Sequence, residues 1–129
     1  MSVKEAIIYC RTATTEQDIN AQLELCKKYA IEHGCKVQEV FLDHGFSANS
    51  ERPEFLNARK FMDGNPSGTL IVSSYDRLYR DSTKMNEFIQ FAKEVKYEVV
   101  SANSNDGSLL ELELIAGADK ITKEHKALD

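Results

Sequence analysis

The stretch from Ile7 to Gln17 brings together side chains that could bind a phosphate group. It reads Ile-Ile-Tyr-Cys-Arg-Thr-Ala-Thr-Thr-Glu-Gln, an apolar run typical of a buried strand, followed by a hydroxyl-rich turn and a helical pattern. The strand is expected to break at Arg11, and Thr14 or Thr15 can cap the helix. A guanidinium, hydroxyl donors and the free N–H groups of a helix N-terminus then meet at one point. An ordinary strand-to-helix turn with a surface arginine has the same pattern, so other parts of the chain must decide.

The arginines of this chain are distributed differently from its lysines. The net charge of −5 by itself argues against a nucleic-acid partner, because such binding depends largely on neutralising phosphates. Most lysines fall on predicted helical faces, whereas the segments that we read as loops or strand ends hold Arg11, Arg52, Arg77 and Arg80. Since guanidinium can pair with two phosphate oxygens at once, this segregation indicates a concentrated anion site on an otherwise acidic protein.

Apolar runs and amphipathic segments alternate along the chain. We expect strands at 5–10, 36–42, 69–73 and 97–102, and helices at 16–33, from Pro53, at 82–95 and at 108–128. The inner face of the first helix is predicted to carry Ile19, Leu23, Cys26, Ala30 and Ile31. This alternation predicts a three-layer α/β fold, in which a mostly parallel sheet of four to five strands has helices on both faces and the chain ends in a helix.

Length, hydropathy and cysteine usage set the class of protein. With 129 residues, 42% of them hydrophobic, the chain is expected to form one domain spanning 1–129. The apolar runs are too short to span a membrane and the first residues lack the order of a secretory signal, so we expect a cytoplasmic protein. Cys10, Cys26 and Cys35 are odd in number and lack Cys-x-x-Cys spacing, which favours free buried thiols over disulfides or structural zinc.

The charged candidates follow the predicted strands. In parallel sheets, ligands lie beyond the carboxyl ends of the strands, where the strand order reverses. Arg11 follows the first strand, Asp43 the second, and residues 76–80 the third. Guanidinium groups gathered at one edge repel one another unless an anion or carboxylates lie between them. The sequence therefore predicts a functional anion site at this edge.

Three short motifs, in this order, resemble the catalytic domain of the serine recombinases, the resolvase and invertase family. They are Tyr9-Cys10-Arg11-Thr12-Ala13-Thr14-Thr15-Glu16-Gln17 with Gln22, then Asp43-His44-Gly45-Phe46-Ser47 with Arg52-Pro53, then Asp76-Arg77-Leu78-Tyr79-Arg80. The resemblance extends from about Ala6 to Asn103. It implies site-specific DNA recombination or integration in mobile elements: a serine attacks the DNA phosphodiester, a covalent 5′-phosphoserine link forms, and arginines stabilise the charge without a metal or other cofactor.

The resemblance also implies roles for individual residues. The arginines that would hold the scissile phosphate and its developing charge are Arg11, Arg52, Arg77 and Arg80. Asp76 would orient them or assist proton transfer. The residues that would support the site or contact DNA are Tyr9, Gln17, Gln22, Asp43 and Ser47, of which the glutamines would brace the loop. Simpler roles stay open: Asp76 as a cap or an arginine partner, the glutamines as solvated helix residues, and Asp43 as the start of a turn.

One position departs decisively from the family pattern Tyr-x-Arg-Val-Ser. The nucleophile should stand two residues after Arg11, and that position is Ala13, whose methyl group cannot attack phosphorus. Thr12 and Thr14 carry hydroxyls, but neighbouring side chains on an extended backbone point in opposite directions, so neither would reach the place of the serine. The chain as written is therefore expected to be inactive, either as a natural relative or through a Ser→Ala change.

Lesser departures lie elsewhere in the chain. Ala48 stands where the family has glycine, and Asp119-Lys120 stands where Glu-Arg is common. The chain ends at Asp129, before any helix-turn-helix or zinc-ribbon module. Recognition of a specific DNA site is therefore expected to come from a removed portion of the protein or from a partner.

Other function classes compete with a silenced recombinase domain. One is a regulatory or interaction module that keeps the fold and pairs with recombinases. Another is a flavodoxin-like domain whose Thr12, Thr14 and Thr15 would cradle a cofactor phosphate, although the arginines and the lack of a glycine-rich fingerprint count against it. A magnesium-dependent nuclease using Asp43 and Asp76 ranks last, because two isolated carboxylates beside so many cations make a poor magnesium site.

The predicted last helix, 108–128, leads us to expect a homodimer or higher oligomer. It has more apolar surface than one stripe against its own sheet requires, in Leu109, Leu110, Leu112, Leu114, Ile115 and Ala118. We expect sedimentation velocity to show a dimer at high protein concentration. Sedimentation as a monomer throughout the concentration series would indicate instead that this helix folds back on its own domain.

Overall fold

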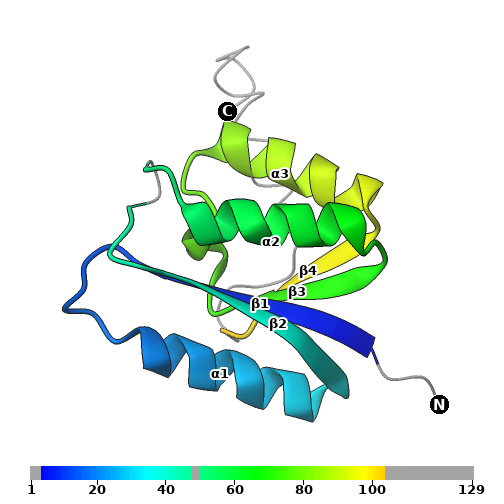
Figure 1. The fold of residues 1–129 in the computed structure, drawn as a ribbon, viewed down its shortest axis with the longest axis horizontal. Helices are drawn as coiled ribbons and strands as arrows, with labels where there is room; N and C mark the ends of the chain where they lie inside the picture. Colours follow the sequence, from blue (N-terminus) through cyan, green and yellow to red (C-terminus); the bar gives the residue numbers. More distant parts are fainter. Residues whose placement is uncertain (1–3, 48–49, 104–129) are drawn as a thin grey trace, which may run out of the picture.

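The computed structural model describes residues 4–47 and 50–103 and has the layered arrangement shown in Figure 1. Its strands are β1 (Lys4–Thr12), β2 (Cys35–His44), β3 (Gly68–Val72) and β4 (Tyr97–Ser101). Its helices are α1 (Ile19–Glu32), α2 (Pro53–Gly64) and α3 (Ser82–Glu94), with a short 3-10 helix, η1 (Tyr75–Arg77), after β3. The predicted helix at 108–128, Ala48 and the Asp119-Lys120 pair lie outside the described residues.

The strands form one parallel sheet with the order β2-β1-β3-β4. Helix α1 covers one face, and α2 and α3 lie side by side over the other (Figure 1). This arrangement confirms the predicted α/β fold with helices on both faces of a parallel sheet. It follows from the alternation of strands and helices, because each parallel connection must cross over the sheet and buries its helix there.

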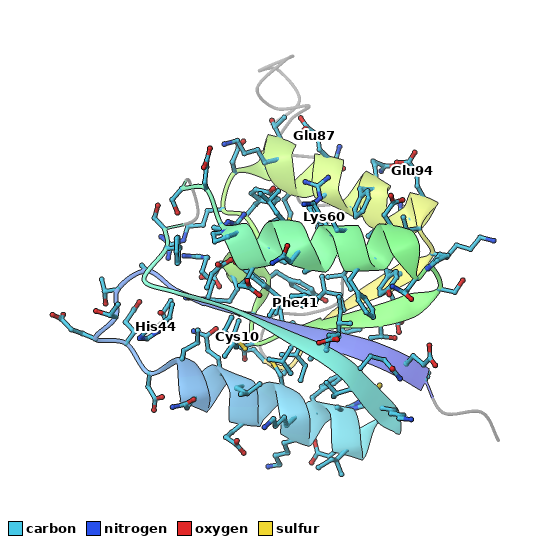
Figure 2. The ribbon with its side chains drawn as sticks, viewed as in Figure 1. Cys10, Phe41, His44, Lys60, Glu87 and Glu94 are labelled. Atoms are coloured by element: carbon cyan, nitrogen blue, oxygen red, sulfur yellow. The ribbon has the colours of Figure 1, made fainter. Side chains whose placement is uncertain are left out.

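The central strand β1 is buried on both faces, and its alternating side chains divide the core. Ile7 and Tyr9 pack into the cluster beneath α2 and α3. Ile8 and Cys10 pack toward α1, in the cluster that also contains Cys26. Figure 2 shows Cys10 in this layer between the sheet and α1. Both thiols are free and fully buried, and a hydrogen bond with Cys10, together with burial, raises the pKa of Cys26.

The strands extend further than the sequence predicts at the edge that carries the candidate site. The predicted ends, Cys10 and Leu42, are wrong because two further register pairs, Arg11 with Asp43 and Thr12 with His44, continue β1 and β2. Pairing between the two strands supplies backbone partners that neither segment reveals alone. Asp43 therefore lies within a strand instead of starting a turn.

Helix α1 also differs from its prediction. It begins at Ile19 because Asp18 is the N-cap, and the Asp18 carboxylate accepts a hydrogen bond from the amide of Ala21 at 3.2 Å. Thr14 and Thr15, the predicted caps, lie in the preceding turn. The assignment of Ile31 to the inner face is wrong, since this side chain is 80% exposed near the end of the helix.

Asp43 connects the sheet to the N-terminus of α2. Its carboxylate accepts hydrogen bonds from the Tyr9 hydroxyl at 2.8 Å and from the amides of Glu54 at 3.1 Å and Phe55 at 3.0 Å. The residue at the N-cap position, Arg52, makes no side-chain capping bond. Burial above all raises the pKa of Tyr9, so its hydroxyl keeps the proton that it donates. Asp43 thus acts as a cap contributed by a neighbouring strand.

We predict that Asp43→Ala destabilises the domain by about 3 kcal/mol, because it leaves helix amides and a buried hydroxyl without their acceptor. Asp43→Asn, which retains one acceptor oxygen, should cost less. Urea denaturation of the variants measures both effects. The matched control is Asp63→Ala, an exposed carboxylate on the same helix. If Asp43→Ala is no more harmful than Asp63→Ala, the carboxylate does not hold α2.

Candidate active site

The strand order reverses between β1 and β3, and the candidate site begins there. The two strands pair only as far as Tyr9 and Val72. Beyond this pair, β1 leads to α1 on one face of the sheet and β3 leads to α3 on the other. The side-chain amide of Gln22 fills the gap: it accepts from the Arg11 amide at 3.1 Å and the Ser73 hydroxyl at 3.3 Å, and donates to the Arg11 carbonyl at 2.8 Å. The Gln22 side chain therefore makes the hydrogen bonds to the Arg11 backbone that a neighbouring strand would otherwise make.

Arg11 is buried, with 2% of its surface exposed. Its guanidinium donates through Nε to the carbonyl of Arg77, through Nη1 to that of Phe46 and through Nη2 to that of Asp76, each at 3.0 Å. Burial lowers the pKa of Arg11, and the charges of Arg77 and Arg52 lower it further. In this conformation the Arg11 guanidinium joins the loops after β2 and β3 to the end of β1.

Arg52 is also buried, at 4% exposure, and shares one acceptor with Arg11. Its Nη1 donates to the Arg77 carbonyl at 3.0 Å, and its guanidinium carbon lies 4.3 Å from the ring centre of Phe55 and 4.8 Å from that of Tyr79. Main-chain carbonyls and aromatic faces stabilise these two cations. The expected anion or carboxylates are therefore not needed to offset the charges of Arg11 and Arg52 in this structure.

Arg77 and Arg80 lie closer to solvent, with side chains 20% and 71% exposed. Arg77 donates from Nε and Nη2 to the two oxygens of Asp76 at 3.2 and 3.3 Å, and from Nη1 to the Arg11 carbonyl at 3.2 Å. Arg80 Nη2 lies 4.0 Å from the Asp76 carboxylate, which also accepts from Ser74. The Asp76 carboxylate therefore hydrogen-bonds Arg77 and lies near Arg80, and both arginine side chains keep part of their surface exposed.

Ala13 is the first residue beyond β1 and is exposed. Its amide donates to Oε1 of Gln17 at 2.8 Å, and the amide of Thr14 donates to the same oxygen at 3.2 Å. Thr12 is 1% exposed, and its hydroxyl contacts His44 and the amide of Gly45. The loop thus presents the side chain of residue 13 to solvent and keeps the neighbouring hydroxyl of Thr12 inside.

Residues 6–125 match the family model described as the N-terminal domain of resolvase. The chain belongs to the resolvase family. The three sequence motifs all lie within the matched residues, and the fold agrees with this membership. A comparison with curated proteins gave no match.

Solved structures place this resolvase-family domain among serine recombinase catalytic domains. The N-terminal catalytic domain of TP901-1 integrase superposes with a TM-score of 0.84 at 25% identity, over 95% of this chain and 99% of that one. A serine recombinase from Sulfolobus solfataricus gives 0.66 at 25% identity, over 95% and 82%. A resolvase family site-specific recombinase from Streptococcus pneumoniae shares the fold, with a TM-score of 0.73 at 15% identity over 97% and 91%.

The structure of this resolvase-family domain joins some of the predicted site residues directly and separates others. Hydrogen bonds connect Arg11 with Gln22 and Arg77, and Gln17 with Ala13. Tyr9 and Asp43 lie together beneath the site, in the core. Ser47 is exposed, and its carbonyl accepts from the amide and hydroxyl of Ser50.

Sequence reasoning missed Ser73, Ser74 and His44. The Ser73 hydroxyl bonds Gln22 and the Ser74 hydroxyl bonds Asp76. The His44 ring bonds the hydroxyl of Thr12. His44 stood inside a quoted motif, but its pairing with Thr12 lies beyond the predicted strand ends and appears only in the register of the folded sheet. Within the described ranges, the resolvase-family domain has no helix long and apolar enough to cross a membrane.

The Asp76 carboxylate gives a prediction about pH. Burial by itself would raise the pKa of Asp76, but the hydrogen bond from Ser74 and the charge of Arg77 outweigh it and hold the pKa below the ordinary 3.8. A lowered folded-state pKa means that Asp76 contributes stability above about pH 4 and loses this contribution as the pH falls through the folded pKa. Near neutral pH we expect the wild-type domain to have a higher melting temperature than Asp76→Asn. In acid this difference in melting temperature should disappear.

Thermal melting from pH 7 to pH 3 tests this, and Asp63→Asn is the control because this aspartate is exposed. The Asp76 side chain is 43% exposed, so solvent screening keeps the effect to a small shift in melting temperature. If the difference in melting temperature stays constant or grows as the solution becomes acidic, the pKa of Asp76 is not lowered in the folded domain.

Proposed function

We propose that this resolvase-family domain is the catalytic domain of a site-specific DNA recombinase of the serine type, silenced because the nucleophile position holds Ala13. The observation that carries the proposal is the placement of residue 13. It is the exposed residue directly after the central strand, and the carbonyl of Arg11, two residues before it, accepts from the guanidinium of Arg77. A serine there would attack the phosphorus, lose its proton and displace the 3′ oxygen, leaving a 5′-phosphoserine link.

The arginines divide into two groups in this proposal. Arg77 and Arg80 are partly exposed and can pair with a phosphate at once, so they make the first contact with DNA. Arg11 and Arg52 hold the backbone of the loop after β3, because both donate to the Arg77 carbonyl. They would reach the phosphate only after exchanging these carbonyls for its oxygens.

Neither neighbouring threonine replaces the missing serine. Thr12 is buried, and its hydroxyl is engaged by His44 and Gly45. Thr14 lies in the turn beyond Ala13, where its amide is fixed by Gln17. In a flavodoxin-like domain the Thr12 hydroxyl would face a cofactor phosphate. Its bonds to His44 and Gly45 argue against that function.

The second candidate function is a regulatory module that pairs with active recombinases, and Ala13 itself favours it. Such a protein would retain the arginine site and the fold but would not cleave. In both readings we propose DNA and a second recombinase subunit as partners, the latter through the 108–128 segment. A cytoplasmic location follows from the proposed DNA substrate.

Restoring the nucleophile tests the proposed function. Ala13→Ser adds one hydroxyl at an exposed position, so it should change stability by less than about 0.5 kcal/mol. Joined to a DNA-binding domain and given its cognate site, the variant should form a covalent adduct at a DNA 5′ end, detected as a slower band on a denaturing gel. Peptide mapping should locate the DNA on residue 13.

Arginine variants supply the controls in the Ala13→Ser background. Arg77→Ala or Arg80→Ala should reduce the adduct at least tenfold, since each removes a phosphate donor. Arg59→Ala should leave it unchanged, because Arg59 lies over the Phe91 ring on the α2 and α3 side, with its guanidinium carbon 4.7 Å from the ring centre. A folded Ala13→Ser protein that binds DNA and forms no adduct would favour the regulatory module.

A further inference from the structure

His44 bridges the two sides of the loop that carries residue 13. Its Nδ1 lies 2.9 Å from the hydroxyl oxygen of Thr12, just before Ala13, and its Nε2 lies 3.0 Å from the carbonyl oxygen of Thr15, two residues after it. Figure 2 shows His44 at the end of β2, beside this loop. The imidazole thus spans the segment whose middle holds the nucleophile position.

The partners of the ring fix its tautomer. The Thr15 carbonyl can only accept, so Nε2 must carry the proton. In the neutral ring, Nδ1 is then an acceptor and receives the hydroxyl proton of Thr12. The Thr12 oxygen remains free to accept from the amide of Gly45 at 3.2 Å. Every polar atom in this chain of bonds has a compatible role.

The backbone around His44 strengthens the connection. The Thr12 carbonyl accepts from the amides of Gly45 at 2.9 Å and Phe46 at 2.8 Å. Gly45 has a φ of +88°, and a Cβ at this position would lie 2.9 Å from the side-chain methyl of Thr15. Glycine therefore allows the loop after β2 to approach the loop after β1 closely enough for the imidazole to reach both partners.

We propose that His44 is a positioning residue that sets the location of residue 13 through Thr12 and Thr15. The bonds to the two sides of the loop limit its movement relative to the sheet, and the Gln17 side chain accepts from the amides of Ala13 and Thr14. This inference rests on the proposed function for its catalytic consequence. A displacement of about one ångström at a nucleophile can cost on the order of a hundredfold in rate.

Replacements of His44 separate its two bonds. His44→Gln retains a donor at the Nε2 position for Thr15, and His44→Phe retains the ring but neither bond. The control is His33→Phe, because His33, the C-cap of α1, bonds the Tyr29 carbonyl at the end of the helix away from the loop. Each is made in the Ala13→Ser background and assayed for the rate of adduct formation at saturating DNA, together with DNA affinity and melting temperature.

We expect His44→Phe to slow adduct formation tenfold or more while DNA affinity changes less than twofold. His44→Gln should recover part of the rate, and His33→Phe should have no effect. Equal rates for His44→Phe and Ala13→Ser alone would overturn the proposal. So would a His44→Gln protein as slow as His44→Phe, since a retained bond to the Thr15 carbonyl would then contribute nothing to the position of residue 13.

An assay without DNA keeps this proposal distinct from the proposed function. In the chain as it stands, backbone amide relaxation measured by NMR should show increased motion at residues 13–15 in His44→Phe and unchanged motion in β3. In its neutral form, the ring of His44 should show the signature of the Nε2–H tautomer. If Ala13→Ser forms no adduct, the proposed function fails, whereas unchanged motion of the loop would refute the tether.

Discussion

A buried cation at the end of the central strand governs the arrangement of the candidate site. The Arg11 guanidinium is a donor without acceptor capacity, so burial requires oxygens from the surrounding chain. The loops after β2 and β3 supply them as main-chain carbonyls of Phe46, Asp76 and Arg77. Each loop is therefore held against β1, because withdrawal of one would leave part of a buried charge without a partner, at a cost of about 1–3 kcal/mol or more.

Other polar side chains extend the same principle to the rest of the edge. Gln22 substitutes for a strand neighbour of Arg11, Asp43 caps α2, and Gln17 holds the amide of Ala13. These side chains are hydrogen-bond partners for main-chain amides and carbonyls at the point where the sheet ends and regular strand pairing stops. Most of the polar motif residues thus hold the backbone at this edge, while the side chains of Arg77 and Arg80 keep part of their surface exposed.

This division is consistent with the proposal that Ala13 silences the domain. Ala13 lies on an exposed loop, and its methyl group takes no part in the hydrogen bonds that hold the loop in place, which involve main-chain amides and neighbouring residues. Loss of the nucleophile can therefore leave the fold and the arginine arrangement intact.

The sequence by itself determined the layered fold and the edge at which the site lies. Buried runs such as Leu70 to Val72 and the amphipathic helices have local periodicities that follow from side-chain direction. Cys10, Cys26 and Cys35 were expected to be free buried thiols: all three are free, but only Cys10 and Cys26 are buried, whereas Cys35 is half-buried. Alignment of the first motif with the family pattern was enough to show that position 13 lacks the serine.

Tertiary structure alone decided how the charged residues are used. The ends of β1 and β2 depend on pairing between Arg11 and Asp43, and the capping of α2 depends on a carboxylate from another element. Arg11 and Arg52 are buried although local sequence suggested loops, because their acceptors are main-chain carbonyls. Every residue has a carbonyl, so such bonds leave no trace in residue type, and only the folded backbone shows which oxygens a side chain can reach.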